Sequence, residues 1–126
     1  MAIYWNKELN VTPIHGMESE RLTGIIVKNH SNFQTVVLYV YMPNDDCHEK
    51  YTATLLELEN IIDKYVYNSS IIILGDFSAQ MFSLNSNQLG KSVLLWDFMS
   101  RNNLSCTAKH ALHYGPEYTC LNTMTV

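Results

Sequence analysis

Two apolar segments with a helix-like segment between them constrain the fold of this chain more than any other feature of its sequence. Residues 34 to 42 read QTVVLYVYM and residues 71 to 75 read IIILG, so both are rich in the residues that β-strands favour. A strand, a helix and a strand in this order predict a βαβ unit with two parallel strands. The helix, residues 48 to 66, is predicted from apolar side chains that recur every three or four positions: Tyr51, Leu55, Leu58, Ile62 and Tyr65.

Polar side chains stand at the end of both predicted strands. The first strand ends in YMPN, residues 41 to 44, and the second ends in GDFS, residues 75 to 78. The carboxyl ends of neighbouring parallel strands meet at one edge of a sheet, roughly 5 Å apart, and open α/β sheets bind ligands there. Asp76 is therefore predicted either to orient an attacking water and help hold a divalent cation, or simply to cap a loop.

The rest of the chain is expected to add antiparallel strands and a second helix. Residues 2 to 5, AIYW, and residues 11 to 16 are predicted as short strands, and residues 21 to 41 as a hairpin. Residues 91 to 102, KSVLLWDFMSRN, predict a helix whose Trp96, Phe98 and Met99 are core contacts rather than a base-stacking platform. Two weak strands are expected near residues 104 to 108 and 117 to 120.

Composition excludes several classes of protein. The 126 residues are 47% hydrophobic, which suits one domain, residues 1–126. A net charge of -4 without a basic stripe does not indicate a free-standing nucleic-acid-binding surface. No apolar run approaches the roughly 20 residues of a membrane span. The three cysteines lack zinc spacing, which favours reduced thiols in an intracellular protein, cytoplasmic or nuclear.

The motif YMPN, followed by an amphipathic helix, an apolar strand and GDFSAQ, resembles the middle of the endonuclease/exonuclease/phosphatase superfamily. The chain is most similar there to the endonuclease domains of non-LTR retrotransposons, because AIYWNKEL, RLTGIIV and GKSVLLWDFMSRNNLSCTA occur in the same order. The resemblance implies a partial two-sheet α/β sandwich with a mixed sheet that contains the βαβ unit. It also implies a DNA phosphodiesterase that uses Mg²⁺ or Mn²⁺.

The resemblance assigns roles to individual residues. Tyr41 and Asn44 match positions that contact the scissile phosphate, and Asp76 matches the aspartate that orients the attacking water and contributes to the metal site. Ser78 stands where the family has asparagine. Because a hydroxyl is shorter than a carboxamide and has one donor where asparagine has two, Ser78 is expected to stabilise the transition state less well.

Further departures from the family pattern lead us to expect a truncated domain with weak metal binding and doubtful activity. The family's metal-binding Asn and Glu precede anything like AIYW, and its terminal Ser-Asp-His segment is not matched by His110 or His113. An incomplete second sheet would leave apolar surface open to self-association. Two alternatives remain open: a noncatalytic remnant or interaction module, and a phosphatase of the same superfamily acting on a small phosphorylated substrate.

Overall fold

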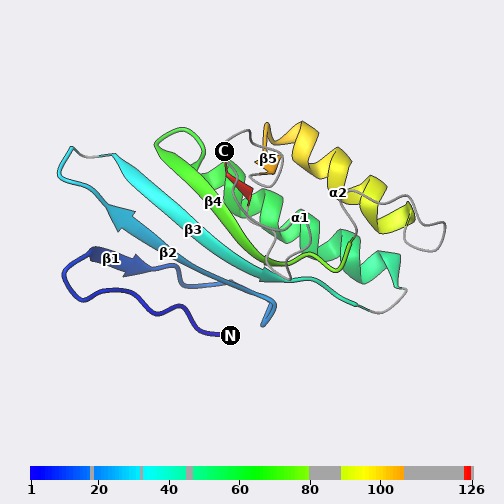
Figure 1. Cartoon of the computed structure of the whole chain (residues 1–126), viewed down its shortest axis with the longest axis horizontal. Coiled ribbons are helices and arrows are strands. Elements are labelled where there is room, and N and C mark those ends of the chain that lie inside the picture. Colours follow the sequence, from blue (N-terminus) through cyan, green and yellow to red (C-terminus); the bar gives the residue numbers. More distant parts are fainter. Residues whose placement is uncertain (18, 32, 45–46, 80–88, 107–123, 126) are drawn as a thin grey trace, which may run out of the picture.

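The computed structural model describes residues 1–17, 19–31, 33–44, 47–79, 89–106 and 124–125. These residues form one mixed sheet and two helices (Figure 1). The strands lie in the order β1-β2-β3-β4-β6-β5. The elements are β1 (Asn10–Pro13), β2 (Leu22–Lys28), β3 (Gln34–Tyr41), α1 (His48–Tyr65), β4 (Ser69–Asp76), α2 (Leu89–Arg101), β5 (Ser105–Cys106) and β6 (Met124–Thr125).

The predicted βαβ unit is confirmed. Strands β3 and β4 are parallel and pair continuously from Gln34 with Ser69 to Tyr41 with Asp76. Helix α1 provides the crossover, and β2 pairs antiparallel with β3 on the other side, so the predicted hairpin is also confirmed. The central strands alternate between buried and half-buried residues, which is the two-residue period of a strand.

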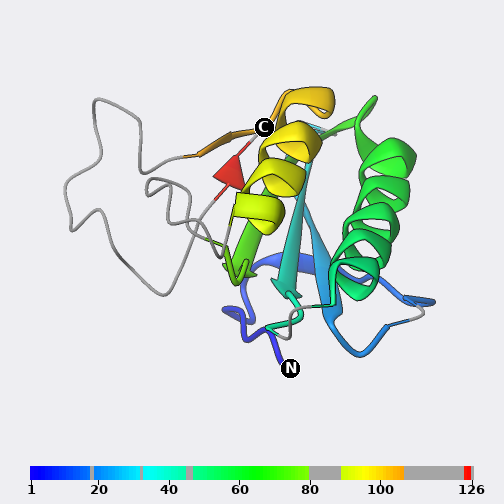
Figure 2. The same ribbon diagram turned by 90° about the vertical axis from the view of Figure 1, so that its right-hand side faces the viewer.

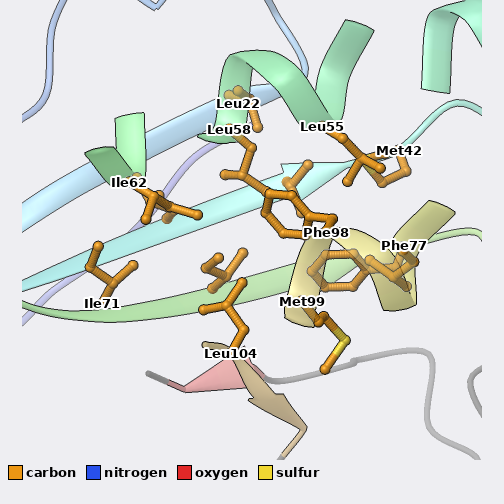
Figure 3. Close-up of a cluster of buried hydrophobic side chains, with 14 of the residues drawn as sticks. Leu22, Met42, Leu55, Leu58, Ile62, Ile71, Phe77, Phe98, Met99 and Leu104 are labelled. Atoms are coloured by element: carbon orange, nitrogen blue, oxygen red, sulfur yellow. The ribbon is translucent and has the colours of Figure 1, made fainter. Parts of the chain in front are cut away.

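Both helices pack against one face of the sheet. The core joins every second residue of β3 and β4 to the apolar faces of α1 and α2 (Figures 2 and 3). In α2, Phe98 and Met99 are buried and Trp96 packs against the same cluster, which confirms their prediction as core contacts. Burying side chains of this size supplies the main stabilisation of such a layer. The core side chains of the central strands are Val36, Leu38, Val40, Ile71 and Ile73.

The opposite face of the sheet carries no helix within the described residues. It presents the alternate side chains of the central strands, and these are half-buried: Val37, Tyr39, Ile72 and Leu74. The described residues therefore form one sheet with a helical layer on one side. They correspond to one of the two sheets of the predicted sandwich, together with the helices that cover it.

Some predicted elements differ from the structure. Residues 2 to 5 are not a strand, since none of the described strands pairs with them; Tyr4 is 93% exposed and Trp5 is 43% exposed. The first strand begins only at Asn10, after a turn in which the Leu9 amide donates to the Asn6 carbonyl at 3.0 Å. A short strand near residues 104 to 108 is confirmed as β5, whereas residues 117 to 120 lie outside the described residues. Strand β6 was not predicted.

The histidines among the described residues lie at the surface. His15, His30 and His48 are exposed, and His110 and His113 lie outside the described residues. Searching the described residues finds no helix with the length and apolar character needed to cross a bilayer.

Candidate functional site

The two sequence motifs meet at the carboxyl ends of β3 and β4. Tyr41 and Asp76 are direct partners in the parallel ladder, and the Met42 amide donates to the Asp76 carbonyl at 2.8 Å. Tyr41 is 46% exposed, and Asn44 and Asp76 are also exposed. The structure thus brings Tyr41 and Asp76 together at an open edge, as the strand order predicts. Asn44 lies three residues beyond Tyr41 on the chain that leaves this edge.

Gly75 makes the close approach of the two strands possible. Its φ is +143°, a conformation that residues with a side chain rarely adopt. A Cβ at this position would overlap the carbonyl group of Val40 on the neighbouring strand. The glycine before Asp76 is therefore required for the backbone that carries the carboxylate to the edge.

Asp76 and Ser78 form a tight turn directly after β4. The Ser78 amide donates to Asp76 Oδ1 at 2.8 Å, which is the hydrogen bond of an Asx turn. The Ser78 hydroxyl oxygen lies 3.3 Å from the Met42 carbonyl oxygen and 3.4 Å from Asp76 Oδ1. A hydroxyl has one hydrogen to donate, so these two acceptors compete for it and the group is turned back toward the protein.

A buried tyrosine of α1, Tyr51, forms a hydrogen bond with the backbone of the turn that follows β4. The Tyr51 hydroxyl donates to the Phe77 carbonyl at 2.8 Å, and both side chains are fully buried. Burial, together with the negative charge of Asp76, raises the pKa of the Tyr51 phenol well above its ordinary value. The phenol therefore stays protonated and keeps donating to the backbone that follows Asp76.

A buried lysine supports the other side of the edge. Lys91, near the start of α2, is only 6% exposed, and its Nζ donates to the Pro43 carbonyl at 3.3 Å. The same ammonium lies 5.8 Å from the centre of the Tyr51 ring. The sequence did not reveal this role, because a lysine in the first turn of a predicted helix usually extends into water.

Arg21, in the turn directly before β2, also contacts a residue of the candidate site. The Arg21 guanidinium carbon lies 5.8 Å from the centre of the Tyr41 ring, and its Nη1 donates to the Tyr41 carbonyl at 3.4 Å. The Tyr41 amide in turn donates to the Arg21 carbonyl at 2.9 Å. Sequence reasoning missed this residue; the signal that could have found it is its position at the start of the hairpin strand that pairs with β3.

Asp76 is the carboxylate at this edge that could help hold a hydrated divalent cation. Mg²⁺ is often bound through one or two carboxylates with water completing its shell, and Asp76 supplies one carboxylate. Within the described residues, both hydrogen bonds to this carboxylate are accepted by Oδ1, so Oδ2 has no described donor. No group of three or more His, Cys, Asp or Glu residues suited to a metal occurs among the described residues.

A separate cavity of about 670 Å³ lies between residues 14 to 21 and one side of α1. Arg21 contributes to its lining, whereas Tyr41, Asn44, Asp76 and Ser78 do not. The candidate site residues therefore lie outside this cavity, at the carboxyl edge of β3 and β4.

Comparison with known proteins gives a result for the fold. No family model matches the sequence, and no curated protein matches it significantly. Among solved structures, the endonuclease domain of TRAS1, a telomere-specific non-LTR retrotransposon, is similar over 96% of this chain, with a TM-score of 0.71 and 12% identity. The human Nocturnin catalytic domain with bound sulfate anion is similar over 82% of this chain, with a TM-score of 0.56 and 15% identity.

The chain spans 57% of the length of the TRAS1 domain and 40% of that of the Nocturnin domain. At these identities the likeness concerns the arrangement of helices and strands, including the mixed sheet with its parallel β3 and β4. This chain therefore has an α/β fold of the endonuclease/exonuclease/phosphatase type.

Proposed function

We propose that this chain is a metal-dependent phosphodiesterase-type domain, similar to a DNA endonuclease and of retrotransposon origin, with little activity by itself. The observation that carries the proposal is the pairing of Tyr41 with Asp76 at an exposed sheet edge in a fold of this type. Ligands of open α/β sheets bind at the carboxyl ends of the strands, where these two side chains lie.

In the proposed mechanism, the chain orients a water and a phosphate against each other. Asp76 accepts a hydrogen bond from the attacking water, while Tyr41 and Asn44 donate to oxygens of the scissile phosphate. The Asx turn and the Tyr51 hydroxyl fix the backbone on both sides of the carboxylate. Mg²⁺ or Mn²⁺, when bound by Asp76 and water, would stabilise the negative charge that develops on the phosphate.

Ser78 is the proposed weak point of the site. Its hydroxyl is directed at the Met42 carbonyl and at Asp76 rather than outward. An asparagine side chain is longer and has two N–H donors, so it could reach a phosphate oxygen that serine does not. Removal of one such transition-state donor costs on the order of 10²-fold in rate in other enzymes.

The proposal is tested by nicking of supercoiled plasmid in Mg²⁺ with four proteins. They are this chain and a domain completed with the flanking segments of a related endonuclease, each with and without Ser78→Asn. We expect no useful nicking by this chain in either form, and an increase with Ser78→Asn on the order of 10²-fold in the completed domain.

The controls in that experiment are Asp76→Ala and EDTA, both of which should abolish nicking by the completed domain. Nicking by the completed domain that survives Asp76→Ala would contradict the proposed role of this carboxylate. Robust, EDTA-sensitive nicking by the bare chain would show that the proposal underestimates its activity.

A noncatalytic interaction module is the second candidate function. The inward orientation of the Ser78 hydroxyl favours it, because a site that only binds phosphate does not need a transition-state donor. A phosphatase acting on a small phosphorylated substrate would use the same edge, and replacing the plasmid with a phosphorylated nucleotide in the same assay separates it from a nuclease. Under each reading the partner is a phosphate compound, with DNA as the proposed one.

A further inference from the structure

Three polar residues lie next to one another at this edge: Arg21 in the turn before β2, Tyr41 at the end of β3 and Asp76 at the end of β4. Tyr41 pairs with Asp76 of β4 on one side. On the other side, the Tyr41 amide donates to the Arg21 carbonyl at 2.9 Å. This contact directly follows the last pair of the β2–β3 ladder, Leu22 with Val40. Leu22 and Val40 are buried in the core on the helical face. Because successive side chains of a strand point to opposite faces, Tyr41 and Asp76 belong to the face without a helix. Arg21 lies in the turn before β2 and also lines the cavity beside α1, and its guanidinium carbon is 5.8 Å from the centre of the Tyr41 ring.

Arg21 is held in place beside Tyr41. Its amide donates to the Ser19 hydroxyl oxygen at 2.9 Å, which fixes the backbone. Its guanidinium contacts Tyr41 twice, through the 3.4 Å hydrogen bond to the carbonyl and through the ring at 5.8 Å from the centroid. Neither contact neutralises the positive charge, and one carbonyl engages only part of the five N–H donors of a guanidinium.

The positive charge of Arg21 is complementary to the negative charge of a phosphate group in the proposed substrate. The chain has a net charge of -4, so an anionic phosphate needs a local cation to approach the carboxylate of Asp76. Lys91 is buried beneath the edge and engaged with Pro43, whereas Arg21 lies beside the exposed ring of Tyr41. The planar fork of a guanidinium matches two phosphate oxygens, which a lysine ammonium does not.

We propose that Arg21 binds the phosphate that Tyr41 contacts, so that the substrate lies along the sheet edge from the start of β2 to the carboxyl ends of β3 and β4. In this arrangement Arg21 flanks the phosphate on one side of Tyr41 and Asp76 on the other, about two strand spacings or roughly 10 Å apart along the sheet. The inference rests on the proposed function and assigns it an anion-binding residue and a direction of substrate approach.

The test is phosphate binding by the full chain and its variants, with two probes: a short DNA duplex followed by fluorescence anisotropy, and AMP followed by amide chemical shifts. Arg21→Gln should weaken binding by about tenfold or more, the value of a lost charge-assisted hydrogen bond. Arg21→Lys keeps the charge without the fork and should fall in between. The matched control is Lys28→Gln, which removes the same charge from the far end of β2 and should change binding less than about twofold.

The two probes distinguish the source of the phosphate. If both probes bind through Arg21 with similar affinity, the site is a general phosphate site. If the duplex binds more tightly, and Arg21→Gln lowers the slope of log binding constant against log salt concentration by about one, the substrate is DNA. Equal effects of Arg21→Gln and Lys28→Gln would overturn the inference, as would a wild-type chain that binds neither probe.

Failure of the proposed function would look different. In that case Arg21 would still determine phosphate binding, but Asp76→Asn would leave the response of the chain to Mn²⁺ unchanged. The amide spectrum of each variant confirms that it is folded, and Arg21→Lys serves as the test should Arg21→Gln not fold.

Discussion

At the scale of single residues, Ser78 is the position where backbone conformation and chemistry meet. Its φ is +47°, the left-handed conformation that residues other than glycine seldom adopt and that asparagine tolerates better than most. The superfamily that this sequence resembles has asparagine at this position. Ser78 therefore has an unfavourable backbone conformation, and its hydroxyl faces the Met42 carbonyl and the Asp76 carboxylate.

Ser78→Asn should consequently stabilise the chain. We expect the free energy of unfolding to rise by about 0.5 kcal/mol, a fraction of the roughly 1–2 kcal/mol that a left-handed conformation costs an ordinary residue. Urea unfolding followed by circular dichroism measures this change. The control is Ser100→Asn on the exposed surface of α2, which should be neutral or slightly destabilising. A loss of stability in Ser78→Asn larger than that of the control would contradict the argument.

The residues of the edge were predictable to different degrees. Asp76 and Tyr41 could be placed together from sequence, because parallel strands put their carboxyl ends side by side. Lys91 could not, since its contact depends on helix packing rather than on local pattern. For Arg21 the signal was its position at the start of the predicted hairpin, but its contact with Tyr41 depends on strand register. The strand expected at residues 2 to 5 was wrong because β-prone residues form a strand only where a partner is available.

At the scale of elements, the end of β4 is the feature on which the site depends. Strand β4 must lie close to β3 up to Asp76, and Gly75 permits this because it has no Cβ to meet the Val40 carbonyl. Strand β3 and both helices were predicted from periodicity to within about two residues, whereas β1 ends at Pro13, three residues before its predicted end. What periodicity could not supply was β6, which is too short to produce a pattern.

Gly75→Ala should therefore be severely destabilising. The substitution combines a strained φ, which costs about 1–3 kcal/mol, with an overlap against backbone that cannot easily move, so we expect a loss of about 3 kcal/mol or more. Gly16→Ala is the matched control, because Gly16 also has a positive φ, +80°, but a Cβ there would meet nothing within 4 Å. Urea unfolding of both variants measures the difference. Equal losses would show that the close approach at Val40 contributes nothing.

At the scale of the whole molecule, the described residues form a sheet with helices on one face and half-buried apolar side chains on the other. A face of this kind is an association surface when it is left open. Sedimentation velocity should therefore show a mass that rises with protein concentration. Leu74→Lys, on the helix-free face, should keep the chain monomeric, whereas Val93→Lys on the exposed side of α2 should not. A cooperatively melting monomer at all concentrations would contradict this expectation.

Binding of a divalent cation by Asp76, at the carboxyl edge of β4, is tested most directly by a Mn²⁺ titration followed by amide NMR. We predict that millimolar Mn²⁺ broadens the signals of Asp76 and Ser78 first, that Asp76→Asn abolishes this broadening, and that Asp63→Asn on the exposed surface of α1 leaves it unchanged. Signals of Asp76 and Ser78 that stay unaffected by Mn²⁺, or broadening that survives Asp76→Asn, would show that Asp76 does not bind the cation.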